Sequence, residues 1–197
     1  MRIRHDWHES LPAPFAVGAI DGVRMGLLQR VLGPRVEVPA DLEVDAAPGQ
    51  VLAPVGGKAV PLSEVPDPVF ATGGLGAGMA IEPDGGTVFS PVDGVVTVTA
   101  GTRHAIGVTD EKGADVLVHI GVDTVSLRGS GFAYFVRKGD RVRAGQALMS
   151  FDPELIRESG LDSHVVVVVT NTEDLAAVTP VVPGMIDAGD LAIAIEY

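Results

Sequence analysis

The sequence predicts an all-β fold, an antiparallel β-sandwich or flattened barrel with an internal duplication and very little helix. Many short apolar runs are separated by turn residues, among them 25 glycines and 14 prolines. Two pairs of similar segments are present: VLAPVGGKAVPL from Val51 with VFSPVDGVVTVT from Val88, and VRKGDRVRAGQALMSFD with VPGMIDAGDLAIAIEY. Paired motifs of this kind suggest two similar β-layers that pack face to face.

The expected strands lie where β-branched and other apolar residues cluster between turn residues. In chain order they are 50–55, 78–82, 87–89, 94–99, 104–109, 115–120, 147–151, 164–170 and 191–196. The segment DEKG at 110–113 predicts a hairpin turn, so the strands on its two sides should pair antiparallel. A short helix is expected at 152–160, with Asp152 as N-cap, Pro153 at its first position and Gly160 beyond its end.

Residues 1–47 differ in character from the rest of the chain. Apolar side chains recur at helical spacing in IDGVRMGLLQRVLG, which predicts an amphipathic helix over residues 20–32. This helix either packs on its own domain or, with Arg24 and Arg30 beside the apolar stripe, docks on a membrane or a partner. The following PADLEVDAAPGQ is typical of a linker, so we expect an N-terminal extension over 1–47 and a domain over 48–197.

Composition narrows the classes of function. A net charge of -12 repels the phosphates of nucleic acid and anionic membrane surfaces, which favours a basic protein as the partner. The sequence contains no cysteine, which excludes disulfides and thiolate chemistry and suits a cytoplasmic protein. The apolar run VVVVV at 165–169 is far shorter than the roughly 20 residues that span a bilayer. Membrane contact is therefore expected only through residues 20–32.

The candidate site consists of two histidines on neighbouring strands. Side chains alternate between the two faces of a strand, so Thr102, His104 and Ile106 of TRHAIGV are expected on the same face. Antiparallel pairing across the hairpin then brings His104 next to His119 of DVLVHIG. A neutral imidazole is a nucleophile when a hydrogen bond fixes its tautomer, and a carbonyl near Gly121 can supply that bond. Such a pair suits phosphoryl transfer, with Thr102 orienting the second ring.

The chain resembles the glucose-type IIA component of the bacterial phosphoenolpyruvate-dependent sugar phosphotransferase system over residues 48–197. The resemblance rests on TRHAIGV, VLVHIGVDTVSLRGSGF, VRKGDRVRAGQALMSFD and the upstream VLAPVGGKAVPLSEVPDPVFATGGLGAGMAIEPDGGTVFSPVDG. It implies an antiparallel β-sandwich that serves as a phosphotransferase component in sugar uptake, with no cofactor and no metal. It also implies that His119 accepts a phosphoryl group from the carrier HPr and passes it to a cysteine of a IIB domain.

The resemblance implies roles for the residues around His119 as well. The side chain of His104 would stabilise the transferring group, and Thr102 would hold that imidazole. Five further residues are implied either to flank the site or to form the apolar rim on which partners dock. They are Asp67, Phe70, Leu75, Gly121 and Asp123.

Other interpretations stay open from the residues alone. A single histidine in an apolar strand is commonly a hydrogen-bonded core residue, and His164 is interpreted as an ordinary surface residue. The pair His104 and His119 also suits zinc, although a zinc site normally has a third protein ligand and the sequence has no H-x-H pair. A biotinyl or lipoyl module would need a lysine in a setting that Lys58 lacks. The last alternative is a regulatory binding module that is not phosphorylated.

Overall fold

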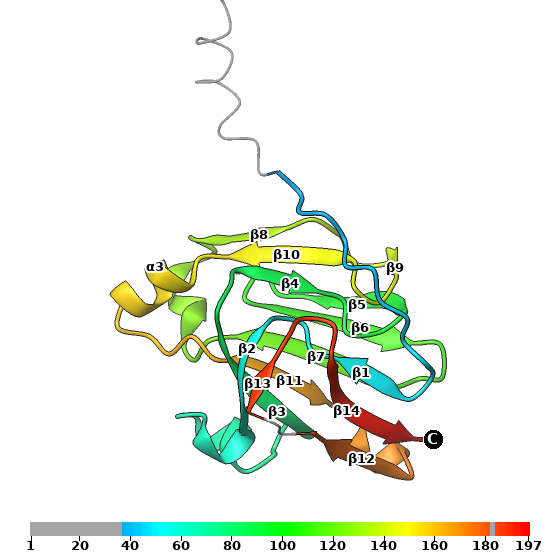
Figure 1. Cartoon of the computed structure of the whole chain (residues 1–197). Coiled ribbons are helices and arrows are strands. Elements are labelled where there is room, and N and C mark those ends of the chain that lie inside the picture. Colours follow the sequence, from blue (N-terminus) through cyan, green and yellow to red (C-terminus); the bar gives the residue numbers. More distant parts are fainter. Residues whose placement is uncertain (1–36, 182–183) are drawn as a thin grey trace, which may run out of the picture. The chain divides into compact units, whose positions relative to one another are not determined.

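The computed structural model describes residues 37–181 and 184–197, so the helix predicted at 20–32 lies outside the described residues. Within those ranges the chain forms three antiparallel sheets and only short helices (Figure 1). The predicted all-β class is confirmed. None of the described helices has the length and hydrophobicity that a membrane-crossing helix needs.

The described strands form one large sheet and two small ones. The eight-stranded sheet contains, in spatial order, β13 (Met185–Ile186), β2 (Gly57–Pro61), β3 (Ala77–Pro83), β11 (Val165–Val169), β7 (Asp115–Ile120), β6 (Ala105–Asp110), β5 (Gly94–Thr99) and β9 (Arg141–Val142). One three-stranded sheet contains β1 (Gln50–Leu52), β14 (Leu191–Glu196) and β12 (Ala177–Pro180), and the other contains β4 (Thr87–Phe89), β10 (Ala147–Phe151) and β8 (Phe132–Tyr134). The helical segments are η1 (Leu62–Glu64), α2 (Pro68–Ala71), η2 (Thr124–Leu127), α3 (Pro153–Glu158) and η3 (Thr172–Asp174).

Each predicted strand is present, with ends that shift by up to three residues. The predicted helix is confirmed as α3, where the Asp152 carboxylate accepts hydrogen bonds from the first-turn N–H groups of Glu154 and Leu155, both at 3.0 Å. We did not predict α2 or the strands β2, β8, β9, β12 and β13. These segments have two to five residues each and include prolines and glycines, so they carry too little periodicity to be recognised.

The internal duplication is visible in the hydrogen bonds between the first pair of similar segments. The N–H of Leu52 donates to the carbonyl of Pro91 at 2.8 Å, and the N–H of Phe89 donates to the carbonyl of Pro54 at 2.8 Å. Leu52 and Phe89 are equivalent positions in the two segments, as are Pro54 and Pro91. The two halves therefore bond to each other reciprocally, as a two-fold repeat requires.

The second pair of similar segments contributes an Ala-Gly turn to each half. The carbonyl of Ser90 accepts a hydrogen bond from the N–H of Gly145 at 2.9 Å, and the carbonyl of Ala53 accepts one from the N–H of Gly189 at 3.0 Å. Ser90 and Ala53 are themselves equivalent positions of the first pair. Both motifs of the duplication are thus joined in the same way in each half.

Residues 41–47, which belong to the segment predicted as a linker, are bonded to these turns. The N–H of Leu42 donates to the carbonyl of Gly145 at 2.8 Å. The side chains of Leu42 and Val44 lie so close to Gly145 and Gly189 that a Cβ at either glycine would clash with Val44. We call this segment the strap, because it crosses both Ala-Gly turns.

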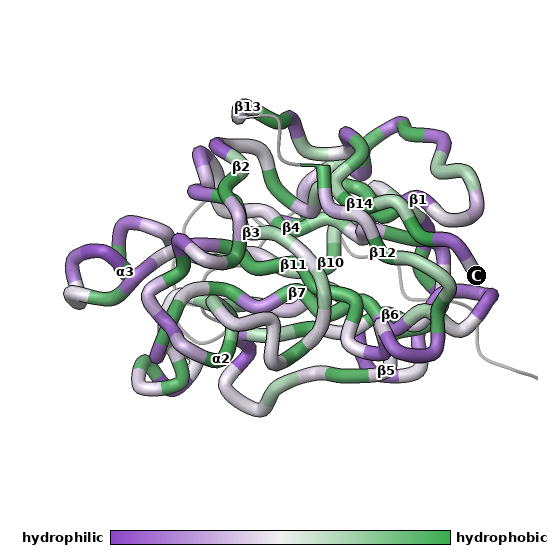
Figure 2. Tube along the Cα trace, turned by 90° about the horizontal axis from the view of Figure 1, so that it is seen from below, coloured by the Kyte–Doolittle hydropathy of each residue, from purple (hydrophilic) through white to green (hydrophobic). Residues whose placement is uncertain are grey.

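Two hydrophobic layers lie on opposite faces of the eight-stranded sheet. Alternate residues of β11 belong to the main core, and the residues between them belong to a smaller outer cluster, so the whole run VVVVV is buried. Leu62 of η1, Val65 and Phe70 of α2 cover this outer cluster. Figure 2 shows the hydrophobic residues concentrated along the central strands, with hydrophilic residues toward the periphery and in α3.

Candidate functional site

His119 lies on the outer face of the eight-stranded sheet and not in the main core. Because side chains alternate along β7, Val118 and Ile120 enter the main core while His119 faces the segment that carries α2. The ring of Phe70 from α2 lies with its centroid 5.0 Å from that of His119, at an interplanar angle of 59°. The imidazole is therefore held between the sheet and an aromatic ring, and remains partly exposed.

The rings of His104 and His119 meet edge to face, with centroids 4.9 Å apart and planes at 76°. This confirms that the two histidines lie together, but the alternation argument behind the prediction was wrong. Ala105 is the register partner of His119, and Ile106 enters the main core. His104 precedes β6, directly after Arg103 in the left-handed region (φ 59°), and this turn of the backbone interrupts the alternation.

Thr102 holds the second imidazole. Its hydroxyl oxygen lies 2.6 Å from Nδ1 of His104, within hydrogen-bond distance. That contact occupies Nδ1, so Nε2 is the nitrogen of His104 that remains for interactions with other groups. The structure thus brings together the three residues expected to carry the chemistry: Thr102, His104 and His119.

The pKa of each imidazole is lowered, which favours its neutral form at pH 7. The pKa of His119 is lowered to about 4, first by burial and then by the nearby His104, while the backbone of Gly121 and the carboxylate of Asp67 act in the opposite direction. Burial also lowers the pKa of His104. Nδ1 of His119 is buried and has no partner in hydrogen-bond geometry among the described residues. The backbone of Gly121 is the hydrogen-bonding group that raises the pKa of this ring, and it lies outside strict hydrogen-bond geometry.

Gly121 is required for a reason other than the one we expected. Its backbone is left-handed (φ 70°), and a Cβ would lie 2.5 Å from the carbonyl oxygen of Asp162 and would clash with the methyl group of Thr124. The N–H of Gly121 donates to the carbonyl of His164 at 2.8 Å. The glycine thus lets the turn after β7 pack against the start of β11.

Asp67 and Asp123 both line the depression that contains His119, but their carboxylates are used differently. Asp67 is the N-cap of α2, and its Oδ1 accepts hydrogen bonds from the N–H groups of Val69 at 2.7 Å and Phe70 at 3.1 Å. Asp123 is left-handed (φ 58°) and exposed, and its side chain does not cap η2. Asp67 therefore has a structural role as well, whereas the carboxylate of Asp123 faces solvent.

The depression is shallow and partly apolar. Its lining residues are Asp67, Phe70, His104, His119, Val122, Asp123, Thr124 and Val125. We did not predict Val122, Thr124 or Val125, although Val125 stands out as an apolar side chain with 53% exposure. Leu75, which we expected on the docking rim, does not line this depression. It is 38% exposed and lines a separate hollow with residues 170–174.

His164 is not the ordinary surface residue that we expected. Its side chain is only 15% exposed, and Nδ1 lies 2.8 Å from the carboxylate of Asp162. Its Nε2 lies 3.9 Å from Glu82, which forms an ion pair with Lys58 at 3.1 Å. None of these residues lines the histidine depression, so they support the sheet beside it.

The described residues do not favour a metal site at the histidine pair. Between residues 37 and 181 and between 184 and 197, no group of three or more His, Cys, Asp or Glu side chains is arranged to hold a metal ion. A structural zinc site has four protein ligands and a catalytic one usually has three. The zinc interpretation therefore lacks its further ligand within this part of the chain.

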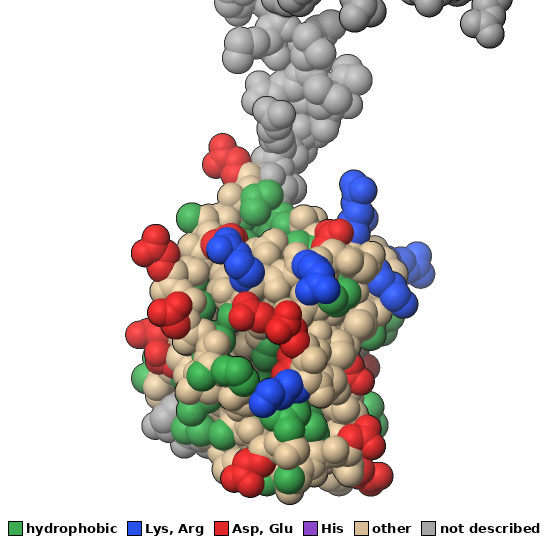
Figure 3. Space-filling model, turned by 90° about the vertical axis from the view of Figure 1, so that its right-hand side faces the viewer, with side chains coloured by type: hydrophobic (Ala, Val, Ile, Leu, Met, Phe, Trp, Pro, Cys, Tyr) green, Lys and Arg blue, Asp and Glu red, His purple; other side chains and the backbone are tan. Residues whose placement is uncertain are grey.

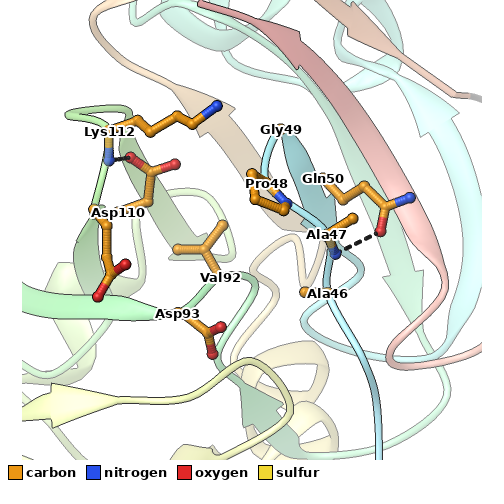
Figure 4. A pocket seen from close by; sticks show the side chains of 10 residues that line it. Ala46, Ala47, Pro48, Gly49, Gln50, Val92, Asp93, Asp110 and Lys112 are labelled. Atoms are coloured by element: carbon orange, nitrogen blue, oxygen red, sulfur yellow. Dashed lines mark hydrogen bonds between the residues drawn. The ribbon is translucent and has the colours of Figure 1, made fainter.

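A second hollow lies at the far end of β6, lined by residues 46–50, Val92, Asp93 and the β6–β7 turn (Figure 4). Its polar groups stabilise turns, since Asp110 accepts from the N–H of Lys112 at 2.9 Å and Gln50 accepts from the N–H of Ala47 at 3.0 Å. Acidic side chains gather near the centre of the face in Figure 3, with lysines and arginines mainly above and around them. The second hollow contains no histidine, so the histidine depression is the better candidate.

Comparison with known proteins identifies the family to which the chain is similar. Residues 49–175 match the family described as phosphoenolpyruvate-dependent sugar phosphotransferase system, EIIA 1. The chain is 44% identical over 140 residues to the glucose-specific EIIA component of Oceanobacillus iheyensis, covering 71% of this chain and 85% of that protein. It is 49% identical over 121 residues to the beta-glucoside-specific EIIBCA component of Bacillus subtilis, covering 61% of this chain and 20% of that longer protein. The solved structure of glucose permease IIA from Mycoplasma capricolum matches with a TM-score of 0.64 and 34% identity, covering 73% of this chain and 93% of that one.

Proposed function

Because the chain belongs to the EIIA 1 family of the phosphoenolpyruvate-dependent sugar phosphotransferase system, we propose that it carries a phosphoryl group on His119. The donor is the phosphorylated carrier HPr. The acceptor is a cysteine of a IIB domain that takes part in sugar uptake, and the transfer takes place in the cytoplasm. The observation that carries this proposal is a neutral imidazole in an open depression, with a second imidazole edge-on to it at 4.9 Å.

The geometry supports Nε2 of His119 as the attacking atom. Nδ1 is buried, so Nε2 is the nitrogen that an incoming group can reach. Its lone pair forms a bond to phosphorus while the bond from phosphorus to the donor nitrogen breaks, and the donor ring keeps that electron pair. A pKa of about 4 leaves the lone pair free at neutral pH, so no proton has to be removed first.

The second imidazole stabilises the charge on the phosphoryl oxygens. When the hydroxyl of Thr102 donates to Nδ1 of His104, the proton of that ring lies on Nε2. An N–H held next to His119 is then available to donate to the transferring group, which is negatively charged throughout the reaction. Thr102 thus sets the tautomer, His104 donates and His119 is the nucleophile.

Transfer of phosphate from phosphoenolpyruvate in the presence of enzyme I and HPr tests the proposal. We expect the label on His119, no label on a folded His119→Gln variant, and labelling of His104→Ala that is slower by about 100-fold, as for the loss of one such donor. His164→Gln is the matched control, because it removes a histidine of the same sheet outside the depression, and it should be labelled at the normal rate. Label that persists in His119→Gln would contradict the assignment.

A further inference from the structure

The loop between β5 and β6 carries Thr102 and His104, and a side chain from another sheet closes it. The N–H of Ala100 donates to the carbonyl of Ala105 at 3.0 Å, which joins the two ends of the loop. The hydroxyl of Tyr134, on β8, lies 2.5 Å from the carbonyl oxygen of Ala105 and 3.3 Å from that of Ala100. A hydroxyl has a single proton to donate, so Ala105 is the main acceptor.

We propose that Tyr134 is a positioning residue for phosphoryl transfer, whose hydroxyl holds the β5–β6 loop so that His104 stays edge-on to His119. This inference rests on the proposed function of the histidine pair. The carbonyl that Tyr134 binds belongs to Ala105, the residue directly after His104. The carbonyl of His104 itself accepts a hydrogen bond from the N–H of Ile120 on β7 at 2.8 Å. The backbone at His104 is therefore fixed both from its own sheet and from β8.

The loop needs such a hold because its backbone is strained. Arg103 has a left-handed φ of 59°, which brings the Cβ of any residue other than glycine too close to the following carbonyl oxygen. The other residues of this kind in the described chain, glycines aside, are Asp123 and Arg128, in the segment on the other side of the depression. Strained conformations persist only where the surrounding contacts impose them. The N–H of Arg103 donates to the carbonyl of Ala100 at 2.9 Å, and the hydroxyl of Tyr134 binds the carbonyl of Ala105 beyond it, so the turn is held on both sides of Arg103.

The hydroxyl of Tyr134 remains a donor throughout the pH range of transfer. Burial raises its pKa, and the backbone of Ala100 and the charge of Arg103 act in the opposite direction without reversing that effect. The hydrogen bond to Ala105 therefore persists at neutral and mildly alkaline pH. Tyr134 also packs on the main core, which fixes the position from which it donates.

Tyr134→Phe tests the inference, with Tyr197→Phe as the matched control. The chain has two tyrosines, and the hydroxyl of Tyr197 binds Asp110 at the end of β6 away from His104, so each variant loses one bonded hydroxyl. The ring is kept, so both variants should fold. The measurements are the rate of transfer from phosphorylated HPr and the NMR titration of His119. In Tyr134→Phe we expect transfer to be slower by about ten-fold, the effect of one hydrogen bond.

The titration separates a positioning role from a merely structural one. His104 contributes to lowering the pKa of His119, so a displaced His104 should let the pKa of His119 rise from about 4 in Tyr134→Phe and leave it unchanged in Tyr197→Phe. An unchanged titration or an unchanged transfer rate in Tyr134→Phe would overturn the inference, even if its unfolding temperature falls. A wild-type chain that takes no phosphate would instead contradict the proposed function, and the titration would still decide whether Tyr134 positions His104.

Discussion

At the scale of single residues, His119 couples the stability of the fold to pH. Its pKa is about 4 in the folded chain and about 6.5 in an unfolded one. Between these values the unfolded chain binds more protons than the folded chain, so the free energy of unfolding falls as pH decreases from about 6.5 to 4 and then levels off. We expect His119 to account for a loss of about 3 kcal/mol over this interval.

Urea unfolding at pH 7 and at pH 4.5 measures this effect. The loss between the two pH values should be smaller in His119→Gln than in the wild type, because glutamine does not titrate. An equal loss in the wild type and in His119→Gln would show that this imidazole is not the group responsible.

The proximity of the two histidines could be predicted from the sequence, because a short turn between two apolar runs indicates an antiparallel hairpin. The way in which His104 reaches His119 could not, since an arginine in the left-handed region has no signature in a single sequence. The requirement for Gly121 was misjudged for a similar reason. The atoms that would clash belong to Asp162 and to Thr124, and only the folded chain brings Asp162 there.

At the scale of elements, the strap makes its own contribution to stability. The side chains of Leu42 and Val44 are half-buried on the Ala-Gly turns, and the Asp41 carboxylate accepts a hydrogen bond from the N–H of Ala147 at 3.0 Å. We expect a chain that begins at Pro48 to fold but to be less stable than one that begins at Glu37, by about 2 kcal/mol for the apolar area that is lost.

Urea titrations of the two truncated chains give the difference directly. Their rates of phosphoryl transfer should be equal, because the turns under the strap do not line the histidine depression. Equal stability of the two chains would mean that the strap contributes nothing, and a slower transfer in the shorter chain would mean that it acts on the site.

Predictions of elements succeeded where the pattern was long enough to be read. The helix α3 was recognised from Asp152 followed by Pro153, and α2 begins with the same signal, Asp67 followed by Pro68. We missed α2 because its four residues show no helical periodicity. That omission affects the site, because α2 places Phe70 on His119 and orients Asp67 through its cap.

At the scale of the whole molecule, the acidic surface restricts the kind of protein that can deliver the phosphoryl group. The net charge of the chain is -12, and the depression itself contains two carboxylates beside the nucleophile. A negatively charged phosphoryl group approaches such a site more easily when its carrier brings positive charge to those carboxylates. The partner face should therefore be basic at its centre, and its approach should depend on salt.

Asp123→Asn tests this requirement without disturbing the fold. Asn readily adopts the left-handed conformation that Asp123 has, and the Asp123 side chain does not cap η2, whereas a change at Asp67 would disturb the cap of α2. We expect association with phosphorylated HPr to be about five-fold slower at low salt, and the difference from the wild type to shrink as salt screens the charges. Glu111→Gln removes an equal charge at the opposite end of the same hairpin and should leave the rate nearly unchanged. If both variants slowed to the same extent, overall charge and not the carboxylate beside His119 would guide the partner.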